Sequence, residues 1–150
     1  METQVSTWKM IKSDHWAFIS FVYFLVFFGG FGYFFLTKET TEIKSYSALV
    51  WMILLIVVPL IGFILRVRKI KSIFEYGTKN TAVINNVSFF RWKGNVTYVF
   101  EYRNDRYMVK NFIVKNGKTK ELLPGQSVEI YHSVDNPKSA VIESLFRKDE

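Results

Sequence analysis

A short run that mixes aromatic and cationic residues is the part of the sequence best suited to bind a ligand. The run consists of Phe89, Phe90, Arg91, Trp92 and Lys93, and further cations follow at Arg103, Arg106 and Lys110. On small β-barrels, aromatic rings stack on bases and cations hold phosphates. The candidate nucleotide- or nucleic-acid-binding residues are Arg91, Trp92, Lys93, Arg103 and Arg106. The alternative is a basic domain that faces anionic lipid, with Trp92 in the head groups or packed in the core.

Catalytic and metal-binding chemistry has little support in the residue types. The chain has two histidines and no cysteine, which excludes disulfides, thiolate nucleophiles and Cys-based metal sites. His15 stands beside an apolar run, and His132 falls on the apolar face of a predicted strand, where a core histidine is expected rather than a general base. No phosphate loop, metal-ligand spacing or nucleophile elbow is present in the sequence. We therefore expect no enzyme, no metal and no cofactor.

Two uncharged apolar runs, residues 16–36 and 47–65, occupy most of the first half of the chain. As helices they would be roughly 28–31 Å long, close to the ~30 Å hydrocarbon core of a bilayer. They predict a transmembrane helical hairpin over residues 16–65, with a connection at residues 37–46. The Ser13-Asp14 pair is suited to cap the first helix, and residues 1–15 form a cytosolic N-terminal tail.

A basic juxtamembrane helix is predicted over residues 66–77, with Gly77 as its C-cap. Its cluster of cations attracts anionic lipid head groups or simply anchors the preceding helix. The cluster consists of Arg66, Arg68, Lys69 and Lys71. Together with two lysines of the N-terminal tail it outnumbers the two lysines of the connection. This bias predicts a multi-pass protein of a bacterial inner (plasma) membrane with both termini in the cytoplasm.

From residue 78 onward the hydrophobic period changes to two, which indicates strands. Strands are predicted at 80–92, 95–103, 106–115, 118–122, 126–133 and 139–145, with turns at 93–95, 104–105 and 116–117. Short connections predict an antiparallel meander, so residues 78–150 form a cytosolic all-β domain: an SH3-like or OB-like barrel or a twisted sheet. Imperfect alternation predicts a bulge near Lys110-Asn111. The same pattern assigns Glu101, Glu129 and Glu143 to the solvent side.

The end of the chain resembles the closing motif of a known bacterial family. The motif covers Gly125 to Tyr131 (GQSVEIY) and Asn136 to Ile142 (NPKSAVI). It is similar to the bacterial domain-of-unknown-function family numbered thirty-five ninety-two, over roughly residues 79–142. The resemblance implies membrane helices joined to a small β domain, and no activity. His132, Ser133 and Val134 depart from the Tyr, Asp and Pro that the family favours.

These observations favour a non-enzymatic integral membrane protein whose cytosolic β domain is a binding or interaction module. Two alternatives remain: a two-helix membrane effector of a bacterial defence system gated by a nucleotide signal, and a membrane-resident immunity or inhibitor protein. The expected partners are the lipid bilayer, anionic lipid head groups, a protein partner or further copies of the chain, and a nucleotide ligand.

Overall fold

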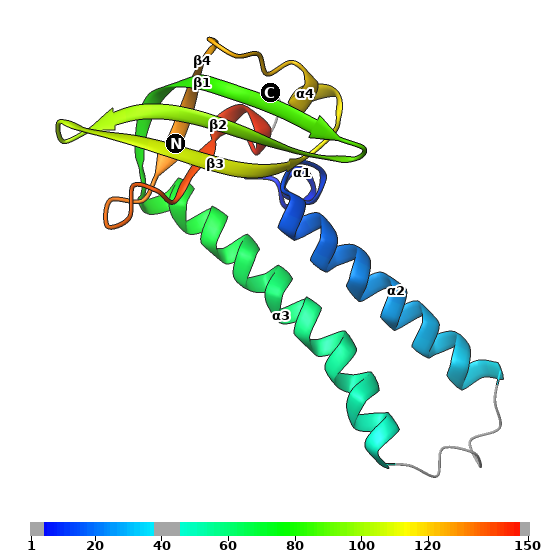
Figure 1. The fold of residues 1–150 in the computed structure, drawn as a ribbon. Coiled ribbons are helices and arrows are strands. Elements are labelled where there is room, and N and C mark those ends of the chain that lie inside the picture. Colours follow the sequence, from blue (N-terminus) through cyan, green and yellow to red (C-terminus); the bar gives the residue numbers. More distant parts are fainter. Residues whose placement is uncertain (1–4, 38–45, 148–150) are drawn as a thin grey trace.

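The computed structural model describes residues 5–37 and 46–147 of the 150-residue chain. The helices are α1 (Thr7–Ser13), α2 (His15–Thr37), α3 (Tyr46–Tyr76) and the short α4 (Gly117–Lys120) (Figure 1). The strands are β1 (Thr78–Phe90), β2 (Lys93–Tyr102), β3 (Asp105–Val114), β4 (Ser127–His132) and β5 (Ala140–Ile142), followed by the 3-10 turn η2 (Glu143–Leu145). Most of the connection predicted at residues 37–46 lies outside the described residues.

The strands form an antiparallel sheet in the order β3-β2-β1-β4-β5, curled into a half-barrel. The long strand β1 pairs with β4 along its first half and with β2 along its second half. The register shifts between Ile84 and Asn86, and such a bulge bends the strand where it changes partner. The predicted meander is therefore correct for β1, β2 and β3 but wrong for β4, which pairs with β1 instead of with the segment at residues 118–122.

The bulge predicted near Lys110-Asn111 is also wrong, because β2 and β3 pair without a shift over their whole length. The alternation of β3 is regular, and its outward face simply carries apolar residues. Met108 is 62% exposed and Phe112 is 43% exposed. The prediction assumed that these large side chains had to be buried, whereas the inward face of β3 is formed by its other residues, among them Val109 and Asn111.

The segment predicted as a strand at residues 118–122 is instead largely the helix α4. A capping box starts this helix. The side chain of Asn116 accepts a hydrogen bond from the Thr119 backbone N–H, and the Thr119 hydroxyl accepts one from the Asn116 backbone N–H. Reciprocal capping of this kind satisfies the first free N–H groups of a helix. The Asn-Gly pair at 116–117 thus begins a helix rather than a hairpin turn.

The side chain of Asn111 links the two edges of the half-barrel. Its amide donates one hydrogen bond to the carbonyl oxygen of Ala140 in β5 and one to the hydroxyl of Tyr98, both at 2.9 Å. Burial raises the pKa of the Tyr98 hydroxyl. The edge strands are therefore joined by a partly buried polar bridge, and the sheet stays curled without a full ladder between β3 and β5.

The core of the half-barrel is completed by residues from the helices. Met10 of α1 and Ile70, Ile73 and Phe74 of α3 are at most 6% exposed and pack in one cluster with the inward side chains of the strands. The N-terminal segment, predicted as a tail, is therefore part of the fold. Ser6 also donates its backbone N–H to the carbonyl oxygen of Phe146 at the other end of the chain.

Gly77 joins α3 to β1 at a place with no room for a side chain. A Cβ atom there would meet the carbonyl oxygen of Ile73 and would lie 2.6 Å from that of His132. Both are backbone atoms, so the junction itself would have to move. Gly77→Ala is expected to destabilise the protein by about 1–3 kcal/mol, the usual cost of overpacking.

Gly117 provides the matched control, because a Cβ atom there meets nothing within 4 Å and the residue begins α4. Gly117→Ala is expected to leave stability unchanged or slightly higher. Denaturant titration of both variants measures the difference. Equal midpoints for the two would show that the junction at Gly77 tolerates a side chain.

The predicted transmembrane hairpin over residues 16–65 is wrong. Within residues 5–37 and 46–147, no helix combines the length and the apolarity needed to cross a membrane. The prediction of an integral, multi-pass protein of a bacterial inner membrane is overturned with it. It rested on the length, the apolar composition and the lack of charge of the runs at residues 16–36 and 47–65.

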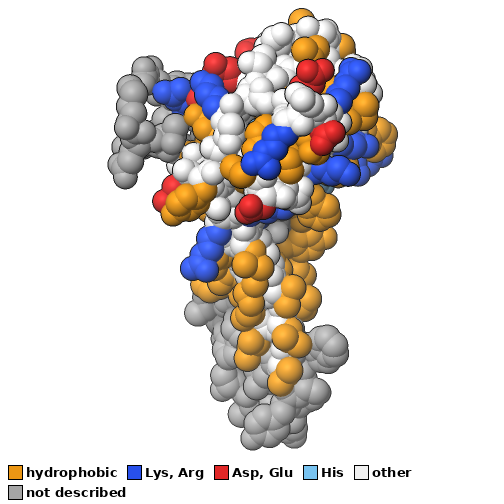
Figure 2. Space-filling view, turned by 90° about the vertical axis from the view of Figure 1, so that its left-hand side faces the viewer, with side chains coloured by type: hydrophobic (Ala, Val, Ile, Leu, Met, Phe, Trp, Pro, Cys, Tyr) orange, Lys and Arg blue, Asp and Glu red, His pale blue; other side chains and the backbone are white. Residues whose placement is uncertain are grey.

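Helices α2 and α3 nevertheless run side by side away from the half-barrel, and we refer to them as the helix pair (Figure 1). The rings of Phe21 and Phe63 lie 5.9 Å apart between them. A Cβ atom at Gly62 would lie 3.6 Å from the Ser20 hydroxyl, which shows how closely the two backbones approach. On the face shown in Figure 2, hydrophobic side chains gather along the helix pair, while most Lys, Arg, Asp and Glu side chains lie on the half-barrel.

Candidate functional site

The turn between β1 and β2 carries three of the candidate ligand-binding residues. Arg91 and Trp92 form the turn, and Lys93 is the first residue of β2. Arg91 has φ of 55°, and Phe90 pairs with Lys93 across the turn. The backbone carbonyl of Trp92 accepts a hydrogen bond from the Lys115 N–H at 2.8 Å, which holds the turn against the end of β3. The run identified in the sequence is therefore one fixed structural unit.

Trp92 packs against the first turn of α2. Its ring lies 5.1 Å from the His15 ring and 5.7 Å from that of Phe18. Phe112 of β3 joins the same group, 6.4 Å from His15 and 6.5 Å from Trp16. Aromatic rings at these spacings attract one another beyond the burial of their area. A cluster of rings from a turn, a strand and a helix thus forms where the half-barrel meets the helix pair.

His15 is enclosed within this cluster. The residue is 9% exposed, and its Nδ1 atom has no hydrogen-bond partner among the described residues. Burial lowers the pKa of His15, and the nearby charge of Lys93 lowers it further, while Asp14 opposes both. The imidazole is therefore favoured in its neutral form, with one buried ring nitrogen unsatisfied.

Cations lie over the faces of rings around this cluster. The guanidinium of Arg91 is 5.4 Å from the centre of the Phe90 ring, and the ammonium of Lys110 is 5.4 Å from that of Phe112. Lys12 of α1 lies 5.0 Å from the Trp8 ring. We call this region the aromatic–basic end. Its rings are Trp8, Trp16, Phe90, Trp92 and Phe112, and its cations are Lys12, Arg91, Lys93, Lys110, Lys115 and Lys120.

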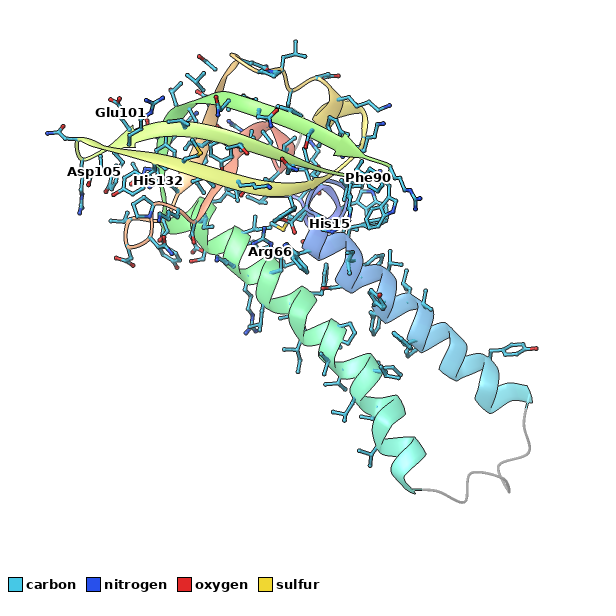
Figure 3. The ribbon with its side chains drawn as sticks, viewed as in Figure 1. His15, Arg66, Phe90, Glu101, Asp105 and His132 are labelled. Carbon is cyan, nitrogen blue, oxygen red and sulfur yellow. The ribbon has the colours of Figure 1, made fainter. Side chains whose placement is uncertain are left out.

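The other two candidate residues, Arg103 and Arg106, lie at the far end of the sheet. Arg103 is in the turn between β2 and β3, and Arg106 pairs with Glu101 beside it. Figure 3 shows Phe90 at one tip of the sheet and Glu101 and Asp105 at the other. The ten residues of β2 separate the two tips by roughly 30 Å, at about 3.4 Å per residue. The five predicted ligand-binding residues therefore do not converge on one site.

The predicted lipid-facing basic cluster is also divided by the structure. Arg66 is turned toward Asp14, and its Nε donates to both carboxylate oxygens at 3.1 and 3.2 Å. Arg68, Lys69 and Lys71 are exposed on α3. Arg66 therefore has a structural partner, whereas the other three remain on the surface.

Asp14 itself is 3% exposed and performs two tasks. Its carboxylate accepts the Arg66 bonds, and it caps α2 by accepting a hydrogen bond from the Ala17 N–H at 2.9 Å. The cap predicted from the Ser13-Asp14 pair is confirmed, and Asp14 provides it. The ion pair of Asp14 and Arg66 joins the start of α2 to α3 where both helices leave the half-barrel.

His132, the one strand histidine, is sealed inside the half-barrel. It is 0% exposed, and its ring lies 5.1 Å from that of Phe100 and 4.4 Å from that of Tyr102. Its Nδ1 is 3.2 Å from the carbonyl oxygen of Ser133, and its Nε2 has no partner within the described ranges. The predicted core position is confirmed, and no substrate can reach this ring in the structure.

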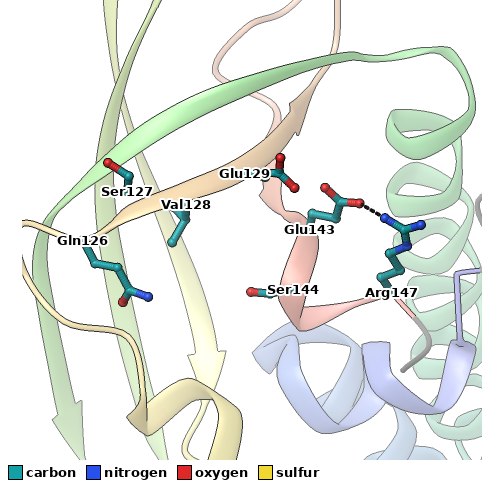
Figure 4. A pocket seen from close by; sticks show the side chains of 7 residues that line it. All are labelled: Gln126, Ser127, Val128, Glu129, Glu143, Ser144 and Arg147. Carbon is teal, nitrogen blue, oxygen red and sulfur yellow. Dashed lines mark hydrogen bonds and ion pairs between the residues drawn. The ribbon is translucent and has the colours of Figure 1, made fainter. Parts of the chain in front are cut away.

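A polar hollow of about 340 Å³ lies beside β4 and η2 (Figure 4). The sequence pattern assigned Glu143 to the solvent side, and this prediction is wrong, because Glu143 is 3% exposed. Its carboxylate pairs with Lys79 at 3.1 Å and with Arg147 at 2.8 Å. Lys79 also pairs with the exposed Glu129 at 2.9 Å. These ion pairs raise the pKa of Lys79, and Lys79 lowers the pKa of Glu129.

The charged side chains at the hollow form an ion-pair network that joins β1, β4 and η2. Both oxygens of Glu143 face cations of the same chain, which leaves little negative charge for a ligand. Groups of three or more His, Cys, Asp or Glu residues that could hold a metal ion are also absent from the described residues.

Sequence reasoning missed the interactions that join distant segments. Asp14 and Arg66 are 52 residues apart and meet in the structure. One signal was present: opposite charges flank corresponding ends of the two apolar runs, and antiparallel helices bring such ends together. Nothing comparable in the sequence indicated that Trp92 would pack on His15.

Comparison with known proteins returned no relative: no protein-family model, no curated protein and no solved structure matches the chain. The resemblance of residues 79–142 to the bacterial family of unknown function therefore stays a prediction.

Proposed function

We propose that this chain is a non-enzymatic binding module that works as an assembly of copies joined through the helix pair. The observation that carries the proposal is the exposure of large apolar side chains on α2 and α3. In the described parts of these helices between residues 22 and 65, fifteen large apolar side chains are 37–71% exposed: Val22, Tyr23, Leu25, Val26, Phe28, Tyr33, Val50, Ile53, Leu54, Leu55, Val57, Val58, Ile61, Ile64 and Leu65.

The size of this surface supports an interface. Full burial of one large apolar side chain removes roughly 60–120 Å² from water, so fifteen half-exposed ones represent roughly 500–900 Å². The largest apolar patch on a typical monomer is about 300–600 Å². A standard protein–protein interface buries about 800 Å² per partner. The helix pair therefore presents about as much apolar surface as one side of a stable interface.

The uniformity of the surface favours a second copy as the occupant. Between His15 and Thr37 there is no Asp, Glu, Lys or Arg, so no charge pattern selects a different partner. A helix that is apolar all round requires neighbours on more than one side. Two helix pairs related by a twofold axis would build a four-helix bundle and bury the same face on both copies.

The polar groups best placed for chemistry are occupied structurally, which supports a binding role over catalysis. His132 is enclosed by aromatic rings, and Glu143 is paired with two cations. General acid–base catalysis requires a titratable group that can reach a substrate. Neither residue meets that requirement.

The mass of the full chain in solution tests the assembly. Sedimentation equilibrium should give a multiple of the 17.7 kDa chain mass. Val26→Glu and Val58→Glu each place a charge on a side chain that is 62% exposed, one in α2 and one in α3. Burying an unpaired carboxylate in the interface is costly, so both variants should sediment at the mass of a single chain.

Val134→Glu is the matched control, since Val134 is 39% exposed in the segment between β4 and β5. It should leave the mass of the assembly unchanged. A wild-type chain that sediments at 17.7 kDa would overturn the proposal. So would a chain that floats with neutral lipid vesicles as single copies, which would assign the apolar surface to lipid.

A further inference from the structure

Positive charges gather at the aromatic–basic end. Its six lysines and arginines are all exposed, and they come from α1, α4, the second half of β3 with the residue after it, and the β1–β2 turn with the first residue of β2. Hydrogen bonds hold these elements together. Asn116, the cap of α4, donates to the carbonyl oxygen of Lys12, and Lys115 donates its N–H to that of Trp92. Of the nearby acids, Asp14 is buried and paired with Arg66, and Glu121 is exposed at the C-terminus of α4. This end therefore presents a positive surface suited to an anionic ligand.

Aromatic rings are interleaved with those cations. Phe90 is 64% exposed, Trp16 54%, Trp92 46% and Phe112 43%. Arg91 covers part of the Phe90 ring and Lys110 part of the Phe112 ring. A ligand that fits this arrangement alternates planar rings with negative charges. Single-stranded nucleic acid has that chemistry, since its bases stack on aromatic side chains and its phosphates bind to cations.

His15 provides an independent indication of a ligand. Its unsatisfied Nδ1 is buried among Trp16, Trp92 and Phe112, which are themselves partly exposed. Buried polar atoms nearly always have a hydrogen-bond partner, so an exception calls for an explanation. The edge of a base stacked in this cluster carries donors and acceptors that can supply the partner.

Other anionic partners fit the arrangement less well. Bases in a duplex are already stacked on each other and offer only their edges, so exposed ring faces favour a single strand. An anionic lipid surface would bind the cations, but it has no planar group to stack on the rings.

We propose that the aromatic–basic end binds single-stranded nucleic acid, with bases on Trp92, Phe90 and Phe112 and phosphates on the surrounding cations. The inference rests on the binding role proposed above and names its ligand, but it does not depend on assembly through the helix pair. It also differs from the five-residue site predicted from the sequence, because Arg103 and Arg106 are excluded.

Fluorescence anisotropy of a labelled twelve-nucleotide oligothymidine, titrated with the full chain, tests this proposal. Binding should weaken as salt rises. Trp92→Ala should raise Kd about 5- to 150-fold, the effect of removing one stacked base. Phe90→Ala should also raise Kd and leaves the packing on α2 untouched, so it tests stacking even where Trp92→Ala disturbs the fold. Replacing Arg91 and Lys110 by Ala should reduce the salt slope by about 0.7 for each phosphate that is no longer neutralised.

Arg103→Ala and Arg106→Ala are the matched controls, because they remove the same charge from the other tip of the sheet. Both should bind with unchanged Kd. Absence of binding by the wild-type chain, or an equal loss in the controls, would overturn the proposal. Binding to anionic vesicles without binding to the oligonucleotide would assign this end to lipid instead. The mass of each variant is measured alongside, so that loss of nucleic-acid binding in an intact assembly is distinguished from failure of the assembly.

Discussion

A fragment that begins at Thr78 is expected not to fold cooperatively, although it contains all five strands. It lacks Met10, Ile70, Ile73 and Phe74, which are at most 6% exposed in the core of the half-barrel. Burial of each such side chain contributes about 1.5–3 kcal/mol, so their removal costs roughly 6–12 kcal/mol. The stability of a whole domain is typically about 5–15 kcal/mol. Circular dichroism and thermal melting of residues 78–150 should therefore show no sharp transition.

A fragment of residues 66–150 provides the graded control, since it restores the three core residues of α3 but not Met10. Its melting should be cooperative and its midpoint should lie below that of the full chain. If residues 78–150 alone melted at the temperature of the full chain, the half-barrel would be an independent domain. The boundary predicted at residue 78 would then describe a folding unit as well as a change in hydrophobic period.

The strands themselves were largely predictable because their signals are local. Alternation of apolar and polar residues located β2 and β4 to within about two residues, since it depends only on which side chains face inward. The turn between β2 and β3 was also located, where Arg103 and Asn104 adopt positive φ.

The turn between β1 and β2 was misplaced for a physical reason. Gly94 was interpreted as a turn residue, yet it lies within β2, where the Phe89 ring and the Ser88 carbonyl leave no space for a Cβ atom. Arg91 adopts the positive φ instead. Glycine occurs both where the backbone needs a positive φ and where another group packs closely against the backbone. A single sequence does not distinguish these two uses.

The pairing of β4 with β1 and the convergence at the candidate site depend on long-range interactions. The short connections favoured a meander, but the bulge in β1 allows that strand to serve two partners. Arg103 and Arg106 are close to Trp92 in sequence, but the whole length of β2 separates them from Trp92 in the structure. Lys12 and Trp16, far away in sequence, join the aromatic–basic end because α1 and α2 pack there.

The ion pair of Asp14 and Arg66 is expected to contribute strongly to stability, since it ties the start of α2 to α3. Arg66→Ala leaves the Asp14 carboxylate buried at 3% exposure without its charged partner. Removing one member of a fully buried pair costs about 3–5 kcal/mol, which is an upper bound here because the Arg66 side chain is 25% exposed. Asp14→Ala leaves the more exposed Arg66 without its partner and also removes the cap on the Ala17 N–H, which is worth about 1 kcal/mol. The total loss should therefore be similar. Denaturant unfolding of the full chain measures both losses.

The double variant and a surface control show whether the loss comes from an uncompensated charge. Asp14→Asn combined with Arg66→Met keeps a capping oxygen and removes both charges, so it should recover much of the stability lost in Arg66→Ala. Arg68→Ala removes an exposed cation two residues away on α3 and should change stability by no more than about 0.5 kcal/mol. If Arg66→Ala were as stable as Arg68→Ala, the pair would only accompany the packing of α2 on α3. A loss in Arg66→Ala that is absent from Arg68→Ala would show that the ion pair itself stabilises the contact between the start of α2 and α3.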